Sequence, residues 1–256
     1  MSEHPLVSVA VPSYNQGKFL EKALNSIFLQ DIPHEILVAD GGSSDGSLAI
    51  LQQWSPRLSW WRSHTDKGQA SAINEAVSIG SAPYVCWLNS DDLLMPGALA
   101  ALLESLEKHR DSPAVYGKCW LLKPDGTKAM PYFTSSFSEW MLARRCFIAQ
   151  PATLIRRSAW DAVGGLDESL HMCLDYDLWW KLYKYGGPLN YLAKEVAATR
   201  MHAETKTSSR RADHYREAMS VVRKHYGSVP LKWYIAWPLM VTFASLLHNF
   251  MKGKSN

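Results

Sequence analysis

The chain has 256 residues, 47% of them hydrophobic and 20% charged, a composition that excludes an intrinsically disordered protein. Its formal net charge of +3 is too weakly basic to indicate nucleic-acid binding, so we expect no nucleic-acid partner. The four cysteines are far apart and form no CxxC pair, which argues against a zinc site and predicts buried thiols in a reducing compartment. The first residues lack the pattern of a signal or transit peptide, so we expect a cytoplasmic location.

Apolar strands alternate with helices through the first 112 residues. Strands are expected near residues 6–11, 35–39, 58–61 and 84–88, and helices near 19–29, 47–54, 69–79 and 96–109. This alternation predicts a parallel sheet covered by helices on both faces. Ligands bind such sheets outside the carboxyl ends of the strands, which is where polar loops follow the first, second and fourth strands.

The pattern changes after residue 113. A strand over 114–122 leads into the turn sequence Pro124-Asp125-Gly126. Helices are then expected near 138–145, 158–163 and 175–185. This α+β half is expected to belong to the same domain, which gives one domain over residues 1–205 with halves at 1–112 and 113–205.

Residues 206–256 form a C-terminal extension of different character. A polar helix is expected over 208–225, and residues 235–247 are nearly all apolar. That run is shorter than the roughly 20 residues needed to cross a bilayer, and the basic residues Lys252 and Lys254 follow it. We expect the extension to contact a membrane surface or a partner, including a second copy of the chain. Plain packing against the domain is the alternative.

Two adjacent carboxylates follow the strand over 84–88, in the sequence Asn89-Ser90-Asp91-Asp92. Unpaired carboxylates at a strand end repel each other, whereas a divalent cation relieves the repulsion and bridges to phosphate oxygens. The sequence therefore predicts a Mg²⁺ or Mn²⁺ site. An acidic turn that caps the next helix is the alternative interpretation.

A third carboxylate, Asp40, ends the second strand and precedes Gly41-Gly42. Such a carboxylate can accept a hydrogen bond from an N–H group of a base, and the glycines allow close approach. The alternative is a helix cap formed by the Ser43-Ser44-Asp45 stretch. The loop after the first strand brings Tyr14 to the same edge.

Taken together, these features resemble the family 2 glycosyltransferases of the GT-A fold. The matching stretches appear in the family's order over roughly residues 5–205, namely Val9–Asn15, Val38–Ser47, Asp66–Gln69, Asn74, Leu88–Asp92, Gln150–Ala152, Gly164–Glu168, Leu174–Trp179 and Arg200–His202. Each stretch is degenerate, but the ordered set is specific. The resemblance implies an α/β, Rossmann-like fold that binds a nucleotide sugar on a mixed central sheet, followed by the C-terminal helical extension.

The resemblance also implies roles for individual positions. Donor binding falls to Pro12, Ser13, Tyr14, Asn15, Asp40, Lys67, Gln69, Asn89 and Asp91. Metal binding falls to Asp92 and Asp91, and His202 matches a position that completes metal or diphosphate binding; a surface histidine is the alternative. Asp175 matches the catalytic base, which takes the proton of the acceptor hydroxyl during inverting transfer.

The chain departs from the family's pattern beside two of these positions. Leu174 stands where many relatives have Glu, which removes a polar group next to Asp175, and Asn89 stands where some relatives have Asp. Asp177 competes with Asp175 for the role of base, but positions two apart on a helix face different directions. Capping of the helix over 175–185 is the alternative for both carboxylates.

The resemblance thus predicts a metal-dependent, inverting glycosyltransferase. By resemblance, residues 1–112 bind the nucleotide diphosphate sugar and residues 113–205 bind the acceptor, a glycan or lipid-linked molecule of surface polysaccharide synthesis at the inner face of the cytoplasmic membrane. A sugar nucleotidyltransferase is an alternative, but its Gly-rich basic loop does not occur at residues 12–17. A non-catalytic protein of the same fold is a second alternative, against which the intact acidic residues argue.

Overall fold

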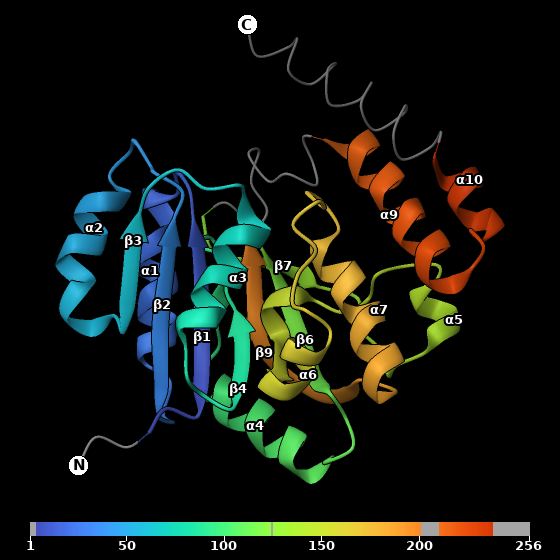
Figure 1. Cartoon of the computed structure of the whole chain (residues 1–256), viewed down its shortest axis with the longest axis horizontal. Coiled ribbons are helices and arrows are strands. Elements are labelled where there is room, and N and C mark those ends of the chain that lie inside the picture. Colours follow the sequence, from blue (N-terminus) through green and yellow to red (C-terminus); the bar gives the residue numbers. More distant parts are fainter. Residues whose placement is uncertain (1–3, 124, 201–209, 238–256) are drawn as a thin grey trace, which may run out of the picture.

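A nine-stranded β-sheet forms the centre of the protein. The computed structural model describes residues 4–123, 125–200 and 210–237. The strand order is β3-β2-β1-β4-β8-β6-β9-β5, with β7 added beside β6 (Figure 1). The strands are β1 (Val7–Ser13), β2 (His34–Asp40), β3 (Trp60–Ser63), β4 (Tyr84–Trp87), β5 (Leu93–Leu94), β6 (Ala114–Leu122), β7 (Lys128–Pro131), β8 (Thr153–Arg156) and β9 (Asn190–Arg200).

The sheet is mixed. β3, β2, β1 and β4 are parallel, which confirms the prediction for the first half of the chain. β8 is antiparallel to both β4 and β6, β9 is parallel to β6, and β5 is antiparallel to β9. Within the parallel part, Ser13 lies opposite Asp40, so the loops after β1 and β2 begin side by side.

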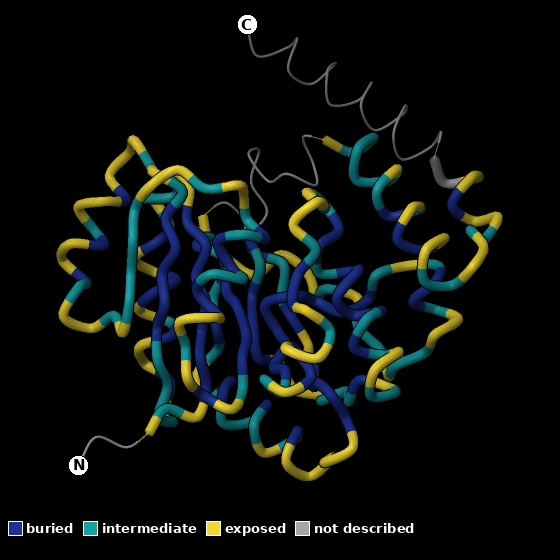
Figure 2. Tube along the Cα trace, viewed as in Figure 1, coloured by how far each residue is buried: buried dark blue, intermediate teal, exposed yellow. Residues whose placement is uncertain are grey.

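Helices cover both faces of the sheet, and the strands between them are the most buried part of the chain (Figure 2). The α-helices are α1 (Gly17–Phe28), α2 (Ser47–Trp54), α3 (Gln69–Ile79), α4 (Ala98–Lys108), α5 (Glu139–Leu142), α6 (Arg157–Ala162), α7 (Leu174–Gly186), α9 (Arg211–Tyr226) and α10 (Leu231–Trp237). Short 3₁₀ turns lie at Ser55–Arg57 and Gln150–Ala152. Each predicted helix occurs, with ends shifted by a few residues.

Alternation along the parallel strands divides the core between the two faces. Val7, Val9 and Val11 of β1 pack with α1 and α4, whereas Ala10 faces the cluster that contains α3 and α7. The cluster on the Ala10 side also includes Trp87 at the end of β4, which stacks on Trp179 with ring centroids 5.9 Å apart. Both faces of the sheet are therefore packed with apolar side chains, and the loops at the strand ends carry the polar groups of the site.

Four strands, β5, β7, β8 and β9, have no counterpart in the sequence prediction. The longest of them, β9, contains several Ala residues with Lys194 and Glu195, residue types that are depleted in strands. It forms because β6 supplies a partner: a Cβ atom on Gly117 would come within 2.5 Å of Val196 Cγ2, so only glycine allows this approach. Tertiary pairing, rather than local propensity, makes this strand.

The described part of the C-terminal extension packs against the domain. Ala218, Val221 and Val222 of α9 are buried in the same cluster as α7, and the Trp233 side chain of α10 donates a hydrogen bond to Ala143 O at 2.8 Å. For residues 210–235 these contacts favour the alternative of plain packing. The predicted apolar run over 235–247 lies mostly outside the described residues, as does the boundary predicted at residue 205.

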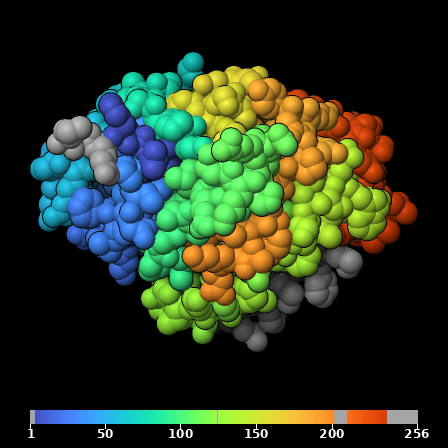
Figure 3. Space-filling model, turned by 90° about the horizontal axis from the view of Figure 1, so that it is seen from below, coloured from blue at the N-terminus to red at the C-terminus, as the bar shows by residue number. Residues whose placement is uncertain are grey.

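Both halves of the chain contribute to one continuous surface. Seen from the side that carries α4, green residues near the middle of the chain adjoin orange residues of its later part (Figure 3).

Across the described residues, no helix is long and apolar enough to cross a membrane. The four cysteines are free thiols, and Cys86, Cys119 and Cys173 are buried, as expected.

Candidate functional site

A pocket of about 780 Å³ lies at the carboxyl ends of the parallel strands β1, β2, β3 and β4. The loops after these strands form one side of it, and the segment before α7 together with the first turn of α7 forms the other. Of the predicted site residues, the lining includes Pro12, Ser13, Tyr14, Lys67, Gln69, Asn89, Asp91 and Asp175. Asn15, Asp40 and Asp92 do not belong to the lining. The structure thus brings most of the predicted donor and catalytic residues together.

The loop after β1 presents polar atoms that lack partners. Ser13 Oγ and Gln16 Oε1 are buried and have no hydrogen-bond partner in the described part of the chain, although both residues line the pocket. Buried polar groups of this kind usually have a partner, so these two atoms are suited to bind a ligand. Beside them, Tyr14 is 63% exposed, and its ring is available for contact with a flat ligand group.

Asn15 connects the first loop to the second instead of facing the pocket. Its φ of 52° lies in the left-handed region, which Asn tolerates better than most residues. Its N–H donates to Ser43 Oγ at 2.8 Å, and its Oδ1 accepts from Ser44 N at 2.9 Å. Asn15 therefore shapes the site, while its predicted donor contact stays a prediction.

Asp40 is fully buried and holds the loop after β2. Its Oδ2 accepts hydrogen bonds from the N–H groups of Gly42 at 3.1 Å and Ser43 at 2.9 Å, and from Ser63 Oγ at 2.7 Å. The other oxygen accepts from Ser43 Oγ at 2.6 Å. With these contacts the carboxylate organises the loop under the pocket, and its predicted contact with a base stays a prediction.

A second carboxylate, Asp66, lines the pocket, whereas Asp40 does not. A Cβ atom on Gly41 would lie 3.5 Å from Asp66 Oδ2, an ordinary contact distance, so Asp66 lies directly beside Gly41. Arg62 Nη1 lies 3.1 Å from the same oxygen, and Gly68 N donates to Oδ1 at 2.8 Å. Sequence reasoning used Asp66 only as part of a motif and missed it as a lining residue, although its neighbour Lys67 pointed to this loop.

At the end of β4, the side-chain amides of Gln69, Asn89 and Gln150 form a hydrogen-bond network. Gln69 Nε2 donates to Asn89 Oδ1 at 2.8 Å, and Asn89 Nδ2 donates to Asp92 Oδ2 and to Gln150 Oε1, each at 3.2 Å. Gln150 is a lining residue that the prediction left without a role. Asn89 thus connects α3, β4 and the turn before β8. An ionised Asp at this position has no N–H group and could not donate to Asp92 or Gln150.

The two carboxylates after β4 face different surroundings. Asp91 is partly exposed and lines the pocket, whereas Asp92 is 2% exposed and accepts a hydrogen bond from Arg200 N at 3.3 Å. Burial raises the pKa of Asp92, and the charge of Asp91 raises it further. The geometry therefore makes Asp91 the carboxylate that a ligand meets first, with Asp92 behind it.

The donor set at this edge fits Mg²⁺ or Mn²⁺. It consists of oxygen atoms: the Asp91 carboxylate on the pocket wall, with Asn89 and Ser90 beside it. Mg²⁺ is commonly held by one or two carboxylates together with substrate phosphates and water. Within the residues that the structure describes, no three His, Cys, Asp or Glu side chains form a cluster suited to a metal ion. His202, the third predicted ligand, lies outside the described residues.

Asp175 stands on the opposite wall, in the first turn of α7. It is partly buried, and its Oδ1 accepts a hydrogen bond from Tyr176 N at 2.8 Å. Desolvation raises the pKa of Asp175 to about 6, and the charge of Glu217 contributes in the same direction. A carboxylate whose pKa lies this close to neutrality is suited to take a proton from a hydroxyl.

Asp177, the competing carboxylate, points away from the pocket. Its side chain is fully buried and lies 2.7 Å from His225 Nε2, 3.0 Å from Lys224 Nζ and 3.3 Å from Lys181 Nζ. Burial alone would raise the pKa of Asp177, but the hydrogen bonds from His225 and Lys224 hold it well below its usual range. Asp177 therefore ties α7 to α9, and only Asp175 reaches the pocket.

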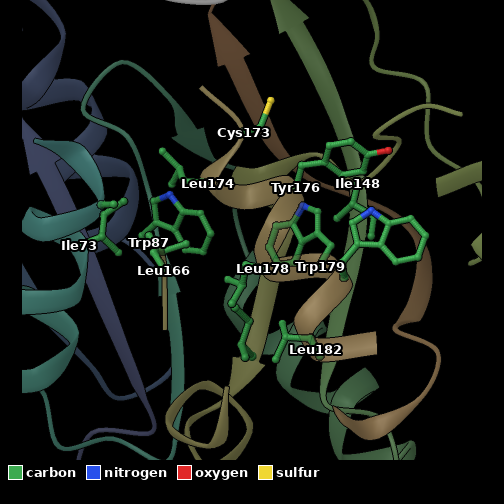
Figure 4. Packing of buried hydrophobic residues seen from close by; sticks show 14 of the residues in the cluster. Ile73, Trp87, Ile148, Leu166, Cys173, Leu174, Tyr176, Leu178, Trp179 and Leu182 are labelled. Atoms are coloured by element: carbon green, nitrogen blue, oxygen red, sulfur yellow. The ribbon is translucent and has the colours of Figure 1, made fainter. Parts of the chain in front are cut away.

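The pocket floor and one wall were not foreseen from the sequence. Trp87 lines the floor, and Figure 4 shows it between Ile73 on one side and Trp179 of α7 on the other. His171 and Met172 of the segment before α7 line the wall beside Asp175. A single buried Trp in an apolar strand and a loop without a motif give no sequence signal, because only tertiary packing brings them to the site.

The comparisons with known proteins agree with this geometry. The family described as Glycosyl transferase family 2 matches residues 8–162 of the chain. Chondroitin synthase of Escherichia coli is 29% identical over 245 residues, which are 92% of this chain and 34% of that protein. The chain thus spans about a third of the length of this relative.

Two solved structures share the fold. S. aureus TarS 1–349 in complex with UDP-GlcNAc has a TM-score of 0.69 at 20% identity, covering 93% of this chain and 71% of that one. The mannosyltransferase PcManGT from Pyrobaculum calidifontis, in complex with GDP-Man and Mn²⁺, has a TM-score of 0.69 at 18% identity, covering 95% and 74%. These likenesses confirm the predicted GT-A fold with its mixed sheet.

Proposed function

The chain belongs to glycosyl transferase family 2, and from that premise we propose that it is a metal-dependent, inverting glycosyltransferase. It would transfer a sugar from a nucleotide diphosphate sugar to an acceptor hydroxyl. One observation carries the proposal: Asp91, in the loop after β4, and Asp175, in the first turn of α7, line the same pocket. A donor seated between them has its phosphates near one carboxylate and its sugar near the other.

The donor half of the pocket provides the binding groups. Ser13 Oγ and Gln16 Oε1 have no hydrogen-bond partner among the described residues, and Tyr14 and Asp66 line the same part of the pocket. We assign the nucleoside to this side, because an exposed aromatic ring and a carboxylate suit a base with N–H donors. A divalent cation held by Asp91 would neutralise charge on the nucleotide diphosphate as it leaves.

The reaction follows from the placement of Asp175. Its carboxylate accepts the proton of the acceptor hydroxyl while that oxygen bonds to the anomeric carbon and the bond to the diphosphate breaks. Attack from the wall opposite the leaving group inverts the anomeric centre. Trp87 and Leu174 at the pocket surface limit the access of water to the reacting atoms.

For the acceptor we propose a glycan or lipid-linked molecule of surface polysaccharide synthesis. The support is the likeness to chondroitin synthase, a polysaccharide-forming relative that aligns with most of this chain. The acceptor would enter beside His171 and Met172, which line the pocket next to Asp175.

We further propose a cytoplasmic enzyme that works at the inner face of the cytoplasmic membrane. Residues 210–237 contain six Lys and Arg against two acidic residues, and Leu231, Tyr234 and Ile235 are exposed on α10. Basic and apolar groups on one helix pair suit an anionic lipid surface. A second copy of the chain is the other occupant of this face, and sedimentation with and without anionic vesicles separates the two.

The function is tested with a panel of UDP-, GDP- and dTDP-sugars, each with and without Mn²⁺. We expect one nucleotide class to raise the unfolding temperature only when Mn²⁺ is present, and the same donor to be hydrolysed slowly in water. Formation of a nucleotide sugar from a nucleoside triphosphate and a sugar phosphate would instead indicate a nucleotidyltransferase. Binding of a donor without hydrolysis or transfer would indicate a non-catalytic protein.

A further inference from the structure

The wall that carries Asp175 is held by a residue of the C-terminal extension. Glu217 of α9 accepts hydrogen bonds from three consecutive backbone N–H groups in the segment before α7. Cys173 N and Met172 N donate to Oε1 at 2.6 and 2.7 Å, and His171 N lies 3.1 Å from both oxygens. Four short contacts thus converge on one carboxylate from a helix more than forty residues along the chain.

These three amides belong to the pocket wall. His171 and Met172 line the pocket, and Cys173 is the N-cap residue of α7, directly before Leu174 and Asp175. The side chain of Cys173 forms no capping hydrogen bond with the helix. Glu217 instead accepts hydrogen bonds from the N–H groups next to the helix start. A carboxylate at this end of a helix is also favoured by the helix dipole.

A second contact, two turns further along α9, keeps the same face of this helix against α7. Lys224 and His225 bind the buried Asp177, and Val221 is buried between the two contact points. Residues 217, 221, 224 and 225 are spaced at intervals of three to four and therefore share one face of α9. Contacts with α9 thus hold the chain on both sides of Asp175, before it at residues 171–173 and after it at Asp177.

We propose that Glu217 is a positioning residue for Asp175. By gathering the amides of residues 171–173, its carboxylate sets the position of the first turn of α7 and so directs the base toward the pocket. The inference rests on the proposed function, because Asp175 acts as a base only in that reaction. It makes α9 part of the catalytic apparatus instead of an appendage to it.

The test compares Glu217→Gln and Glu217→Ala with Asp213→Asn in the full chain. Asp213 lies on the same helix and pairs only with Arg210 and Arg216 among the contacts that the structure describes, so its variant controls for the loss of one negative charge from α9. The measurements are kcat and KM for hydrolysis of the nucleotide sugar that the wild-type chain hydrolyses fastest, and the affinity of the matching nucleoside diphosphate with Mn²⁺. Hydrogen exchange of the amides of residues 172 and 173 reports on the contact itself.

We expect kcat to fall roughly tenfold to hundredfold in Glu217→Ala, the effect of a displacement of about 1 Å in a catalytic group. Glu217→Gln keeps one acceptor oxygen and should retain more activity. The KM and the nucleoside diphosphate affinity should stay within about twofold of wild type, and Asp213→Asn should match wild type throughout.

Two results would overturn the inference. If both Glu217 variants exchange the two amides faster and unfold at lower temperature but keep the wild-type kcat well below that temperature, Glu217 only stabilises the fold. If nucleotide affinity falls as much as kcat, the whole pocket has collapsed and no specific positioning exists. A wild-type chain without turnover on any nucleotide sugar contradicts the proposed function and this inference with it.

Discussion

The end of β4 and the first turn of α7 each carry two closely spaced carboxylates, and each pair divides in the same way. Asp91 and Asp175 line the pocket, whereas Asp92 and Asp177 are buried. The buried members differ in their partners. Asp177 meets three basic side chains, whereas the partners of Asp92 in the described part of the chain are neutral groups, among them Asn89 and the backbone of Arg200.

This difference separates two kinds of structural carboxylate. The pKa of Asp177 is held low, so its charge is a permanent part of the contact between α7 and α9. The pKa of Asp92 is raised by burial and by Asp91, a state that a cation at Asp91 would relieve. The region around β4 is thus suited to receive a positive charge, and the region around Asp177 already contains it.

The largest expected effect comes from Asp175→Asn. The amide keeps the size of the side chain but cannot take a proton, so transfer should fall by about two to four orders of magnitude. Turnover should be measured together with the affinity of the nucleoside diphosphate, which we expect to be unchanged because Asp175 faces the sugar and acceptor. A variant that retains a tenth or more of the wild-type rate would show that another group is the base.

The second prediction separates the β4 pair. Asp91→Asn should weaken Mn²⁺-dependent binding of a nucleoside diphosphate by roughly two orders of magnitude or more, because the pocket-facing ligand of the cation is lost. Asp92→Asn should weaken it by about tenfold, as expected of a group behind the ligand. Calorimetry at several Mn²⁺ concentrations measures both. The reverse order would make Asp92 the ligand and Asp91 its support.

The sequence was informative where chemistry and local pattern coincide. The alternation of strands and helices predicted the parallel half, and the residues at the ends of β1, β3 and β4 came together in one pocket. The predicted donor contacts of Asp40 and Asn15 stay predictions, and the structure adds that both side chains bind neighbouring loops. A motif shows that a polar residue is needed at a position without showing whether it holds a ligand or a loop.

What the sequence could not give depends on contacts between distant segments. β9 is made by its pairing with β6, and the roles of Asp177 and Glu217 appear only when α9 is placed against α7. Alternation and spacing within α7 showed that Asp175 and Asp177 face different directions, but not which of them faces the pocket. Local patterns contain no information on which helix covers which face.

The third prediction concerns the pair in α7, Asp175 and Asp177. Asp177→Asn removes the negative charge while Lys181, Lys224 and His225 remain, which should lower the free energy of unfolding by about 3 kcal/mol. Because the pKa of Asp177 is depressed, its contribution is fully present above the pKa of the unfolded chain and is lost as the pH falls through the folded value. Urea unfolding should therefore show the full difference from wild type at pH 7 and a smaller difference at pH 3, where the unfolded chain has begun to bind the proton while the folded chain has not. An equal difference at both values would mean that packing, not charge, is responsible.

The smallest expected effect has the opposite sign. The pKa of Asp175 is raised to about 6, so at neutral pH the folded chain holds a charge that the unfolded chain solvates better. Between the unfolded and folded pKa values the native state binds more protons, and the stability of the wild type therefore falls as the pH rises through this interval. Asp175→Asn lacks this charge and should be more stable than wild type by roughly 1–2 kcal/mol at pH 7, with the gain disappearing near pH 4. The transfer rate of the wild type should report the titration of Asp175. It should rise with pH toward a plateau above about pH 6, because the base must be deprotonated. A destabilised Asp175→Asn at pH 7 would show that Asp175, like Asp177, is a structural carboxylate.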